Sequence, residues 1–416
     1  MIATTRATDG WQYVAERARA WLADDAAATP ITPALPVIDL GRGELERRTA
    51  PHIIAAVADA LDRGETHYTS RPGIAPLRHA LADRLAAESG VAYDPHSEIL
   101  ISSGGQEGLF VAVQMLVRPG DEVLLADPGY PAYNDAVRLA GGVCVSVPVD
   151  PTTGIGLTAA AIEARLTPRT RLLVLVTPDN PTGAVIGGDE LAKIAALAVE
   201  RDFLVLFDEI YKAFVFDGAA HLNIAALPGM RARTVIVGSF SKGYAMTGWR
   251  VGYVAGEAHL IQPITDLKLA LSICSAAPSQ WAALAALTGP QDAVDEMRAD
   301  LVERRAILLP ALAAMGLLHG NPRGAYYAFA DIRSTGLSSA ECARLFLERA
   351  GVRTLPGHLF GLGGEGYLRF ALTQPTPVIH DAMTRLTPLV QGLKPGRTAK
   401  TQRAQRTQRG KREEEC

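Results

Sequence analysis

Short, continuously apolar runs alternate with helix-like segments through the middle of this chain. The runs are rich in Val and Leu and comprise Glu122–Ala126, Val143–Val147, Leu172–Thr177, Leu204–Phe207, Val235–Gly238 and Val251–Val254. Between them, helical patterns occur at Gln106–Leu116, Ala132–Ala140 and Asp189–Arg201. Strands whose hydrophobicity is continuous rather than alternating are covered on both faces, as in parallel sheets flanked by helices. We therefore predict an α/β fold with a mostly parallel sheet in a large domain over residues 51–288.

The rest of the chain has a different pattern. A length of 416 residues is enough for two or three compact units. After residue 288 a charged helix pattern at Asp292–Met315 precedes a Gly-rich strand candidate at Gly324–Ala330 and a second helix pattern at Ser338–Ala350. We predict a smaller α+β domain over residues 289–393, joined by the N-terminal segment 1–50.

The last residues differ in composition. The formal net charge of the chain is −3, yet residues 394–416 hold eight Lys or Arg and three Glu, so this tail carries +5. Because the tail lacks large apolar side chains, we expect it to be disordered. The balanced charge of the whole chain argues against a nucleic-acid or membrane partner.

Cysteine usage and the N-terminus bear on location. The four cysteines are scattered, with no metal-ligand spacing, and the nine histidines form no metal-like pattern, so we expect free thiols and no metal. The first residues lack the apolar core of a signal peptide, and no apolar run is long enough to span a membrane. The sequence thus predicts a cytoplasmic protein.

Polar motifs follow several of the predicted strands. The segments Thr177–Gly183 (TPDNPTG), Asp208–Tyr211 (DEIY) and Ser239–Lys242 (SFSK) each come directly after an apolar run, and Gly248–Gly252 (GWRVG) follows further on. Because ligands of open α/β sheets bind beyond the carboxyl ends of the strands, we expect these segments to form one site.

The order of these motifs resembles the class I/II aminotransferases, which are fold-type-I pyridoxal-phosphate enzymes. The resemblance covers about Val37 to Leu389 and includes Tyr68 with GIAPLR, SSGGQEGL, DPGYPAY, NPTG, DEIY, SFSKGYAMTGWRVG and YLRFAL, in the family's order. It implies a pyridoxal 5'-phosphate cofactor, small-molecule amino-acid and 2-oxo-acid substrates, and a homodimer.

The resemblance implies a role for each residue that would act on the cofactor ring. Lys242 would form the Schiff base and move the proton during catalysis. Asp208 would keep the ring nitrogen protonated, so that the ring can accept electrons. Tyr211 and Asn180 would donate to the ring oxygen, and Tyr130 would stack on the ring.

The phosphate and the substrate would be held by further residues. The implied phosphate ligands are Gly104, Gly105, Gln106, Ser239, Ser241 and Arg250, with Tyr68 donated by the neighbouring subunit. Arg369 would bind the substrate α-carboxylate as a bidentate fork, and Gly43, Asn180 and Tyr130 would also contact the substrate.

The chain departs from the usual family pattern in three places. Gln106 is neutral where many relatives carry a lysine, which leaves Arg250 as the main cation for the phosphate. Asp179 stands where relatives often have Asn. The stretch GRGELERR replaces a GEPDF-like segment, so Arg42, or Arg71 in the loop shared between subunits, could pair with a distal group of the substrate.

The function predicted from the resemblance is amino transfer between an L-amino acid and a 2-oxo acid in a ping-pong cycle. An aspartate-type or aromatic donor is the expectation. A lyase, cyclase or oxidase that uses the same cofactor is the alternative, because fold and cofactor residues do not decide which bond reacts. A transcription regulator is disfavoured because only about 35 residues precede the resemblance, and a nicotinamide dehydrogenase because no G-x-G-x-x-G follows a strand.

Overall fold

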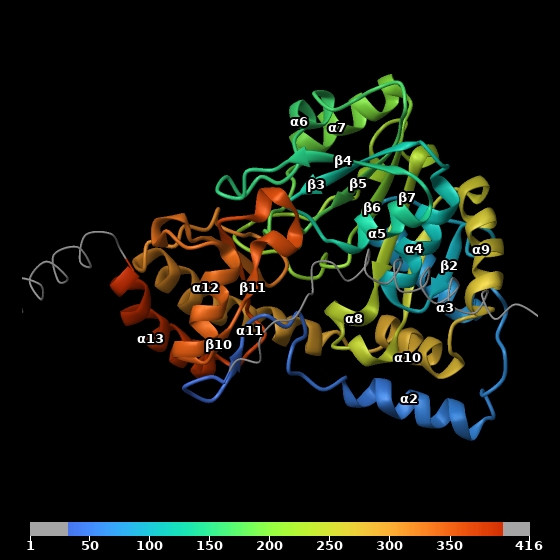
Figure 1. The fold of residues 1–416 in the computed structure, drawn as a ribbon. Helices are drawn as coiled ribbons and strands as arrows, with labels where there is room; N and C mark the ends of the chain where they lie inside the picture. The colour runs from blue at the N-terminus through green and yellow to red at the C-terminus, as the bar shows by residue number, and fades with distance from the viewer. Residues whose placement is uncertain (1–31, 394–416) are drawn as a thin grey trace, which may run out of the picture.

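A seven-stranded sheet forms the centre of the structure, a computed structural model that describes residues 32–393 (Figure 1). Its strands are β2 (Ile99–Ser102), β3 (Glu122–Asp127), β4 (Val143–Pro148), β5 (Thr170–Val176), β6 (Leu204–Asp208), β7 (Thr234–Ser239) and β8 (Gly252–Ala255). The spatial order is β2-β8-β7-β6-β5-β3-β4. All neighbours from β4 to β7 pair in parallel, and β8 is antiparallel to β7 and β2. The predicted α/β class and mostly parallel sheet are confirmed.

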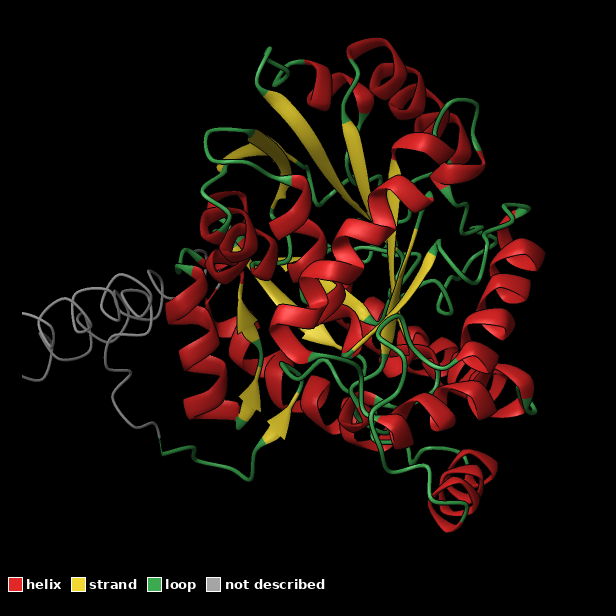
Figure 2. Ribbon diagram, turned by 90° about the vertical axis from the view of Figure 1, so that its right-hand side faces the viewer, coloured by secondary structure: helices red, strands yellow, loops and turns green. Residues whose placement is uncertain are grey.

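Helices cover both faces of this sheet, as Figures 1 and 2 show. The helices of this part of the chain are α2 (Pro51–Asp62), α3 (Ala75–Ser89), α4 (Gly104–Leu116), α5 (Ala132–Leu139), α6 (Ala159–Glu163), α7 (Gly188–Arg201), α8 (Phe240–Gly243), α9 (Ala258–Ser272) and α10 (Ala277–Thr288). Among them, α2 packs against α10 and lies apart from the sheet, and α8 follows directly on β7. On β6, Leu206 packs into the core that includes α4, α5 and α9, whereas Val205 and Phe207 pack into the core that includes α6 and α7. Successive strand residues point to opposite faces, so a strand covered on both sides must be apolar throughout.

Each apolar run that predicted a strand is a strand, and the bounds shift by one or two residues. Strand β2 was not predicted. It has four residues, Ile99–Ser102, and is followed almost at once by the glycines that open α4.

The C-terminal part has its own core. It contains α11 (Asp292–Ala314), β9 (Tyr327–Asp331), α12 (Ser339–Leu345), β10 (Val352–Arg353), β11 (Leu355–Pro356), β12 (Tyr367–Ala371) and α13 (Thr376–Leu393). Strands β11, β12 and β9 form an antiparallel sheet, and β10 pairs in parallel with β1 (Ile38–Asp39). In Figure 1 these elements lie to one side of the central sheet. The pairing of β1 with β10 means that residues 38–39 pack with the C-terminal part.

Short helical segments complete the described chain. Five-residue π-helical geometry extends α12 over Phe346–Ala350, and 3-10 helices occur at Ile224–Ala226, Arg231–Arg233, Thr247–Trp249, Arg333–Thr335, Gly357–Phe360 and Leu362–Gly364. Within residues 32–393, no helix combines the length and apolar character needed to cross a membrane. The predicted disordered tail at 394–416 and the first 31 residues of the N-terminal segment lie outside the described residues.

The sheet register brings the polar motifs to one edge. Val176 at the end of β5 pairs with Asp208, and Asp208 pairs with Val237 of β7. The segment that begins at Thr177, the carboxylate of Asp208 and the turn at Ser239 therefore meet beyond the carboxyl ends of neighbouring strands, as the sequence predicts.

Candidate active site

A cavity of about 410 Å³ opens at this edge of the sheet and faces β12 of the C-terminal part. The predicted site residues that line it are Gly43, Gly105, Gln106, Tyr130, Asn180, Asp208, Tyr211, Ser239, Ser241, Lys242, Arg250 and Arg369. Gly104 adjoins them at the start of α4, next to the Arg250 guanidinium. Only Tyr68, among the predicted residues, lies elsewhere.

Lys242 is held in the short helix α8, directly after β7. Its Nζ donates to the carbonyl oxygen of Gly43 at 2.7 Å and lies 5.9 Å from the ring centre of Tyr211. Burial, assisted by the positive charge of Arg369, lowers the pKa of Lys242 to about 8. A lysine with a lowered pKa supplies the neutral amine that attacks a carbonyl carbon.

Asp208 is a buried carboxylate at the end of β6. Its Oδ2 accepts from the hydroxyl of Tyr133 at 2.7 Å, and its Oδ1 accepts from the backbone N–H of Ile210 at 2.9 Å. Burial raises the pKa of Asp208 to about 6, although these hydrogen bonds oppose the rise. A carboxylate of this basicity can share a proton with a nitrogen base in the cavity.

The start of α4 and the turn after β7 form a cradle suited to an anion. A Cβ atom at Gly104 would lie 2.7 Å from Nη2 of Arg250, and one at Gly105 would lie 2.7 Å from Cδ1 of Ile210. Gly104 also has φ +80°, so glycine is required on both counts. Ser239 caps α8 by accepting from the N–H of Ser241 at 3.1 Å. Two helix N-termini and one guanidinium thus converge, the arrangement that binds phosphate.

Arg369 is a buried cation on β12. Its Nη1 donates to Oδ1 of Asn180 at 2.8 Å and its Nη2 to the carbonyl oxygen of Gly41 at 2.6 Å, whereas its Nε has no partner. It forms no ion pair with any acidic group in residues 32–393. A buried guanidinium with an unused donor and no counter-ion is suited to bind a carboxylate.

Tyrosines form the remaining wall. The hydroxyls of Tyr211 and Tyr327 are 2.9 Å apart, and the guanidinium of Arg369 lies 4.2 Å from the ring centre of Tyr327. Burial raises the pKa of Tyr211 well above its ordinary value, so its hydroxyl stays protonated and can donate. Tyr130 lines the same cavity and donates to Oε1 of Gln106 at 3.1 Å.

Asp179, the departure in the loop after β5, has a structural role. Its Oδ2 accepts from both the N–H of Thr182, at 3.1 Å, and the Thr182 hydroxyl, at 2.5 Å. Burial raises the pKa of Asp179 to about 6. The side chain therefore closes the turn that carries Asn180 and does not line the cavity.

The two arginines considered for a distal substrate group separate in space. Arg42 lines the cavity and pairs with Glu44, and its side chain is 71% exposed. Arg71 pairs with Asp266 and is not among the lining residues. Tyr68 is 81% exposed and lies beside a separate hollow formed with Cys274 and Pro278.

Sequence reasoning missed several residues of this site. Tyr133 contacts Asp208, although it lies within the DPGYPAY motif that pointed to Tyr130. Tyr326 and Tyr327 surround Lys242 and Arg369, and their only sequence signal is an aromatic pair in the Gly-rich strand candidate. Thr247 and Glu44 also line the cavity.

The residues present fit pyridoxal phosphate. The glycine cradle beside Arg250 matches the phosphate, the raised pKa of Asp208 matches the ring nitrogen, and the lowered pKa of Lys242 matches the aldehyde carbon. The guanidinium of Arg369, which lines the cavity, remains for a second anionic group.

Comparison with known proteins agrees with this geometry. The family model for aminotransferase class I and II matches residues 36–386. An aromatic-amino-acid aminotransferase 2 of Thermococcus litoralis is 37% identical over 360 residues, which are 86% of this chain and 92% of that protein. An aspartate aminotransferase of Pyrococcus abyssi shows the same identity and coverage. The crystal structure of an aromatic aminotransferase from Pyrococcus horikoshii superposes with a TM-score of 0.84 at 38% identity and covers 85% of this chain and 96% of that one.

The chain belongs to the class I and II aminotransferases. It is an amino-group transferase that depends on pyridoxal phosphate. The comparisons do not favour the lyase, cyclase or oxidase alternative.

Proposed function

We propose that the cavity between the sheet edge and β12 transfers an amino group from an L-amino acid to a 2-oxo acid in two half-reactions. The observation that carries this proposal is the meeting of Lys242, whose pKa is lowered to about 8, with the unpaired cation of Arg369 in one cavity. When bound, pyridoxal phosphate supplies an electron sink that stabilises negative charge at the donor Cα.

Each side chain then has a task. With the cofactor bound, Lys242 Nζ would take the proton from the donor Cα as a general base and would then give it, as a general acid, to the carbon on the other side of the donor nitrogen. Asp208 holds the proton of the ring nitrogen, and Tyr133 fixes the orientation of that carboxylate. Arg369 binds the donor α-carboxylate through the second N–H groups of Nη1 and Nη2, which its bonds to Asn180 and Gly41 leave free.

The remaining residues hold the cofactor. Gly104, Gly105, Gln106, Ser239, Ser241 and Arg250 surround the phosphate position. Asn180 accepts from Arg369 through its oxygen, which leaves its amide NH₂, together with the Tyr211 hydroxyl, to donate to the ring oxygen. Tyr130 provides the aromatic surface for the ring, and Gly43 supplies a backbone contact near Lys242.

A homodimer completes the site in this proposal. Tyr68 does not line the cavity of its own chain and exposes 81% of its surface, so it is available to the phosphate of a neighbouring subunit. Leu271 and Ile273, near the end of α9, are also exposed. The next residue, Cys274, lines the hollow beside Tyr68. Burying such apolar side chains would stabilise a dimer.

The donor is aspartate or an aromatic amino acid, with Arg42 as the contact to its side chain. Arg42 lines the cavity, and its exposed guanidinium can leave Glu44 for a distal carboxylate.

We also propose a cytoplasmic location, because Cys144, Cys274 and Cys342 are free thiols.

The first experiment is the absorbance spectrum of the purified protein with pyridoxal phosphate, before and after addition of single L-amino acids. A near-visible band that requires Lys242 and converts to the pyridoxamine form with certain donors supports the proposal and names the donor class. A band that no amino acid converts, or a band unaffected by Lys242→Ala, would contradict it.

A further inference from the structure

A buried cluster of charged groups lies behind the candidate active site and takes no part in the function proposed above. It is centred on Glu209, the residue after Asp208, whose side chain is 2% exposed and does not line the cavity. Consecutive residues at a strand end point to opposite sides of the sheet, so one backbone segment carries Asp208 toward the cavity and Glu209 away from it.

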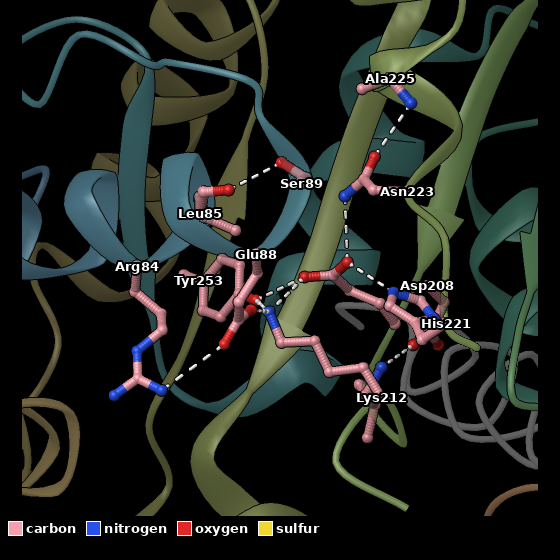
Figure 3. Close-up of polar contacts among 12 residues, drawn as sticks. Arg84, Leu85, Glu88, Ser89, Asp208, Lys212, His221, Asn223, Ala225 and Tyr253 are labelled. Atoms are coloured by element: carbon pink, nitrogen blue, oxygen red, sulfur yellow. Dashed lines mark hydrogen bonds and ion pairs between the residues drawn. The ribbon is translucent and has the colours of Figure 1, made fainter. Parts of the chain in front are cut away.

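The Glu209 carboxylate is fully hydrogen-bonded by side chains. Its Oε1 accepts from Lys212 Nζ and from the Tyr253 hydroxyl, both at 2.7 Å. Its Oε2 accepts from Asn223 at 3.0 Å and lies 3.1 Å from Nε2 of His221. Figure 3 shows Lys212, His221, Asn223 and Tyr253 converging from different segments.

Lys212 extends this cluster to helix α3. Its Nζ also lies 2.8 Å from a carboxylate oxygen of Glu88 and donates to the Tyr253 hydroxyl at 2.9 Å. Arg84 pairs with Glu88 at 3.6 Å (Figure 3). Lys212 therefore has two carboxylates, so it keeps a partner even when Glu209 loses its charge.

Both central groups are charged. Burial by itself would raise the pKa of Glu209, but Lys212 and His221 outweigh it and lower that pKa. Burial opposes the charge of Lys212 as well, and Glu209 more than offsets it, so the pKa of Lys212 is raised well above its ordinary value. A buried ion pair is weak evidence for stability alone, because an apolar pair of similar size often stabilises a fold equally well.

The charge of Glu209 acts on Asp208. The groups that face Asp208 are the Tyr133 hydroxyl, the backbone N–H of Ile210 and the phenol of Tyr130, with Asp179 near by in the loop after β5. Burial is the largest cause of the raised pKa of Asp208, and the neighbouring charge of Glu209 adds to it.

We propose that Glu209, held in its charged form by Lys212, is a positioning residue for Asp208: it fixes the strand end and strengthens the hold of the Asp208 carboxylate on the proton of the cofactor ring nitrogen. This proposal rests on the proposed function, in which Asp208 serves the ring nitrogen. The charge lies where it cannot contact the cofactor, so it acts only through Asp208.

The test replaces the pair by neutral groups of similar size, Glu209→Gln with Lys212→Met, in the full chain loaded with pyridoxal phosphate. The readout is the pH titration of the near-visible absorption band, which reports the proton on the link between Lys242 and the cofactor. When Asp208 holds the ring proton less firmly, a proton on that link meets less repulsion from the ring. We expect the midpoint to rise by about half a pH unit or more, and kcat to fall about fivefold with KM within about twofold.

Three further variants separate charge from packing. Glu190 and Lys193 form a surface pair at the same sequence spacing, 3.0 Å apart, so Glu190→Gln with Lys193→Met is the matched control and leaves the midpoint unchanged. Glu209→Asp keeps the negative charge, so its titration midpoint is expected to stay within about 0.2 pH units of the wild type, even if the shorter side chain lowers the melting temperature. When Asp208→Asn is already present, adding Glu209→Gln with Lys212→Met is expected to leave the midpoint where Asp208→Asn alone has placed it.

The outcomes distinguish this inference from the proposed function. A wild-type protein without a cofactor band would overturn both. If the wild type transaminates, and the double variant folds and shows the same titration midpoint as the wild type, only the inference is overturned. Should the double variant not fold, Glu209→Gln by itself, in which Lys212 keeps Glu88, must shift the midpoint upward by at least as much, and an unchanged midpoint there also overturns the inference.

Discussion

Arg369 of β12 donates a 2.8 Å hydrogen bond from Nη1 to Oδ1 of Asn180, 189 residues earlier in the chain. The bond joins the three-stranded sheet of the C-terminal part to the loop after β5 of the central sheet. It orients the guanidinium and at the same time fixes which end of the Asn180 amide faces the cavity. One contact thus couples the group proposed to bind the substrate to a group proposed to bind the cofactor.

Arg369→Lys is expected to weaken donor binding while the cofactor still binds. A lysine cannot reproduce the planar fork or the hydrogen bond to Asn180, so we expect a loss of about 2–3 kcal/mol, or roughly 30- to 150-fold in kcat/KM. Steady-state kinetics with the preferred donor measure this loss, and the absorption band serves as the control for an intact site. A variant that keeps wild-type kcat/KM would show that another group binds the α-carboxylate.

Capture of pyridoxal phosphate by the cofactor-free protein should rise with pH, with a midpoint near pH 8 and a plateau above about pH 9. With a pKa of about 8, roughly one Lys242 in ten is neutral at pH 7, against roughly one in three thousand for an ordinary lysine. Arg369 is the second cause of the lowered pKa, so Arg369→Met should raise it and move the profile to higher pH. Stopped-flow absorbance over a pH series checks both, and superimposable profiles of the two proteins would contradict this account.

Asp208→Asn is expected to stabilise the cofactor-free protein near neutral pH while it abolishes efficient turnover. The folded protein binds the Asp208 proton more tightly than the unfolded chain, so stability falls as pH rises from about 3.8 to about 6. Above that window the ionised carboxylate costs about 1–3 kcal/mol, which Asn removes because Tyr133 can reverse its hydrogen bond. Thermal unfolding at pH 5 and pH 8 tests this: the gain should be larger at pH 8.

Mixing two inactive variants tests whether Tyr68 serves the neighbouring subunit. If Tyr68→Ala and Lys242→Ala each impair the site, a mixed dimer contains one site with both changes and one site with neither. We therefore expect activity to recover in part after the two proteins are co-expressed or unfolded and refolded together. Each variant treated alone is the control, and no recovery in verified mixed dimers would place Tyr68 in its own subunit's site.

Arg42→Ala is expected to change the preference among donors. If Arg42 contacts a distal carboxylate, the rates with aspartate and glutamate should fall about tenfold relative to phenylalanine. Arg344→Ala is the matched control, because Arg344 is also an exposed arginine in an ion pair but does not line the cavity. If the relative rates with the three donors are the same in the Arg42 variant as in the wild type, Arg42 does not contact the distal group and leaves the proposal.

Much of the fold could be predicted because its signals are local. Continuous apolar runs such as Leu204–Phe207 indicate strands buried on both faces, and the structure bears this out with Val205 and Leu206 in different cores. Strand β2 was not predicted, and the helix predicted at Ser338–Ala350 changes to π geometry at Phe346. Such details depend on neighbouring elements.

The sequence by itself determined the α/β class, the family and the order of the chemical groups along the chain, because apolar periodicity and motif spacing are properties of consecutive residues. Only the tertiary structure decided which groups meet: that Tyr133 contacts Asp208, that Arg42 lines the cavity of its own chain, and that Glu209 forms an ion pair with Lys212 behind that cavity. Contacts of this kind join segments far apart in sequence. Their hydrogen bonds, and the burial that moves the pKa values of Asp208 and Lys242, arise only when the sheet brings those segments together and excludes water.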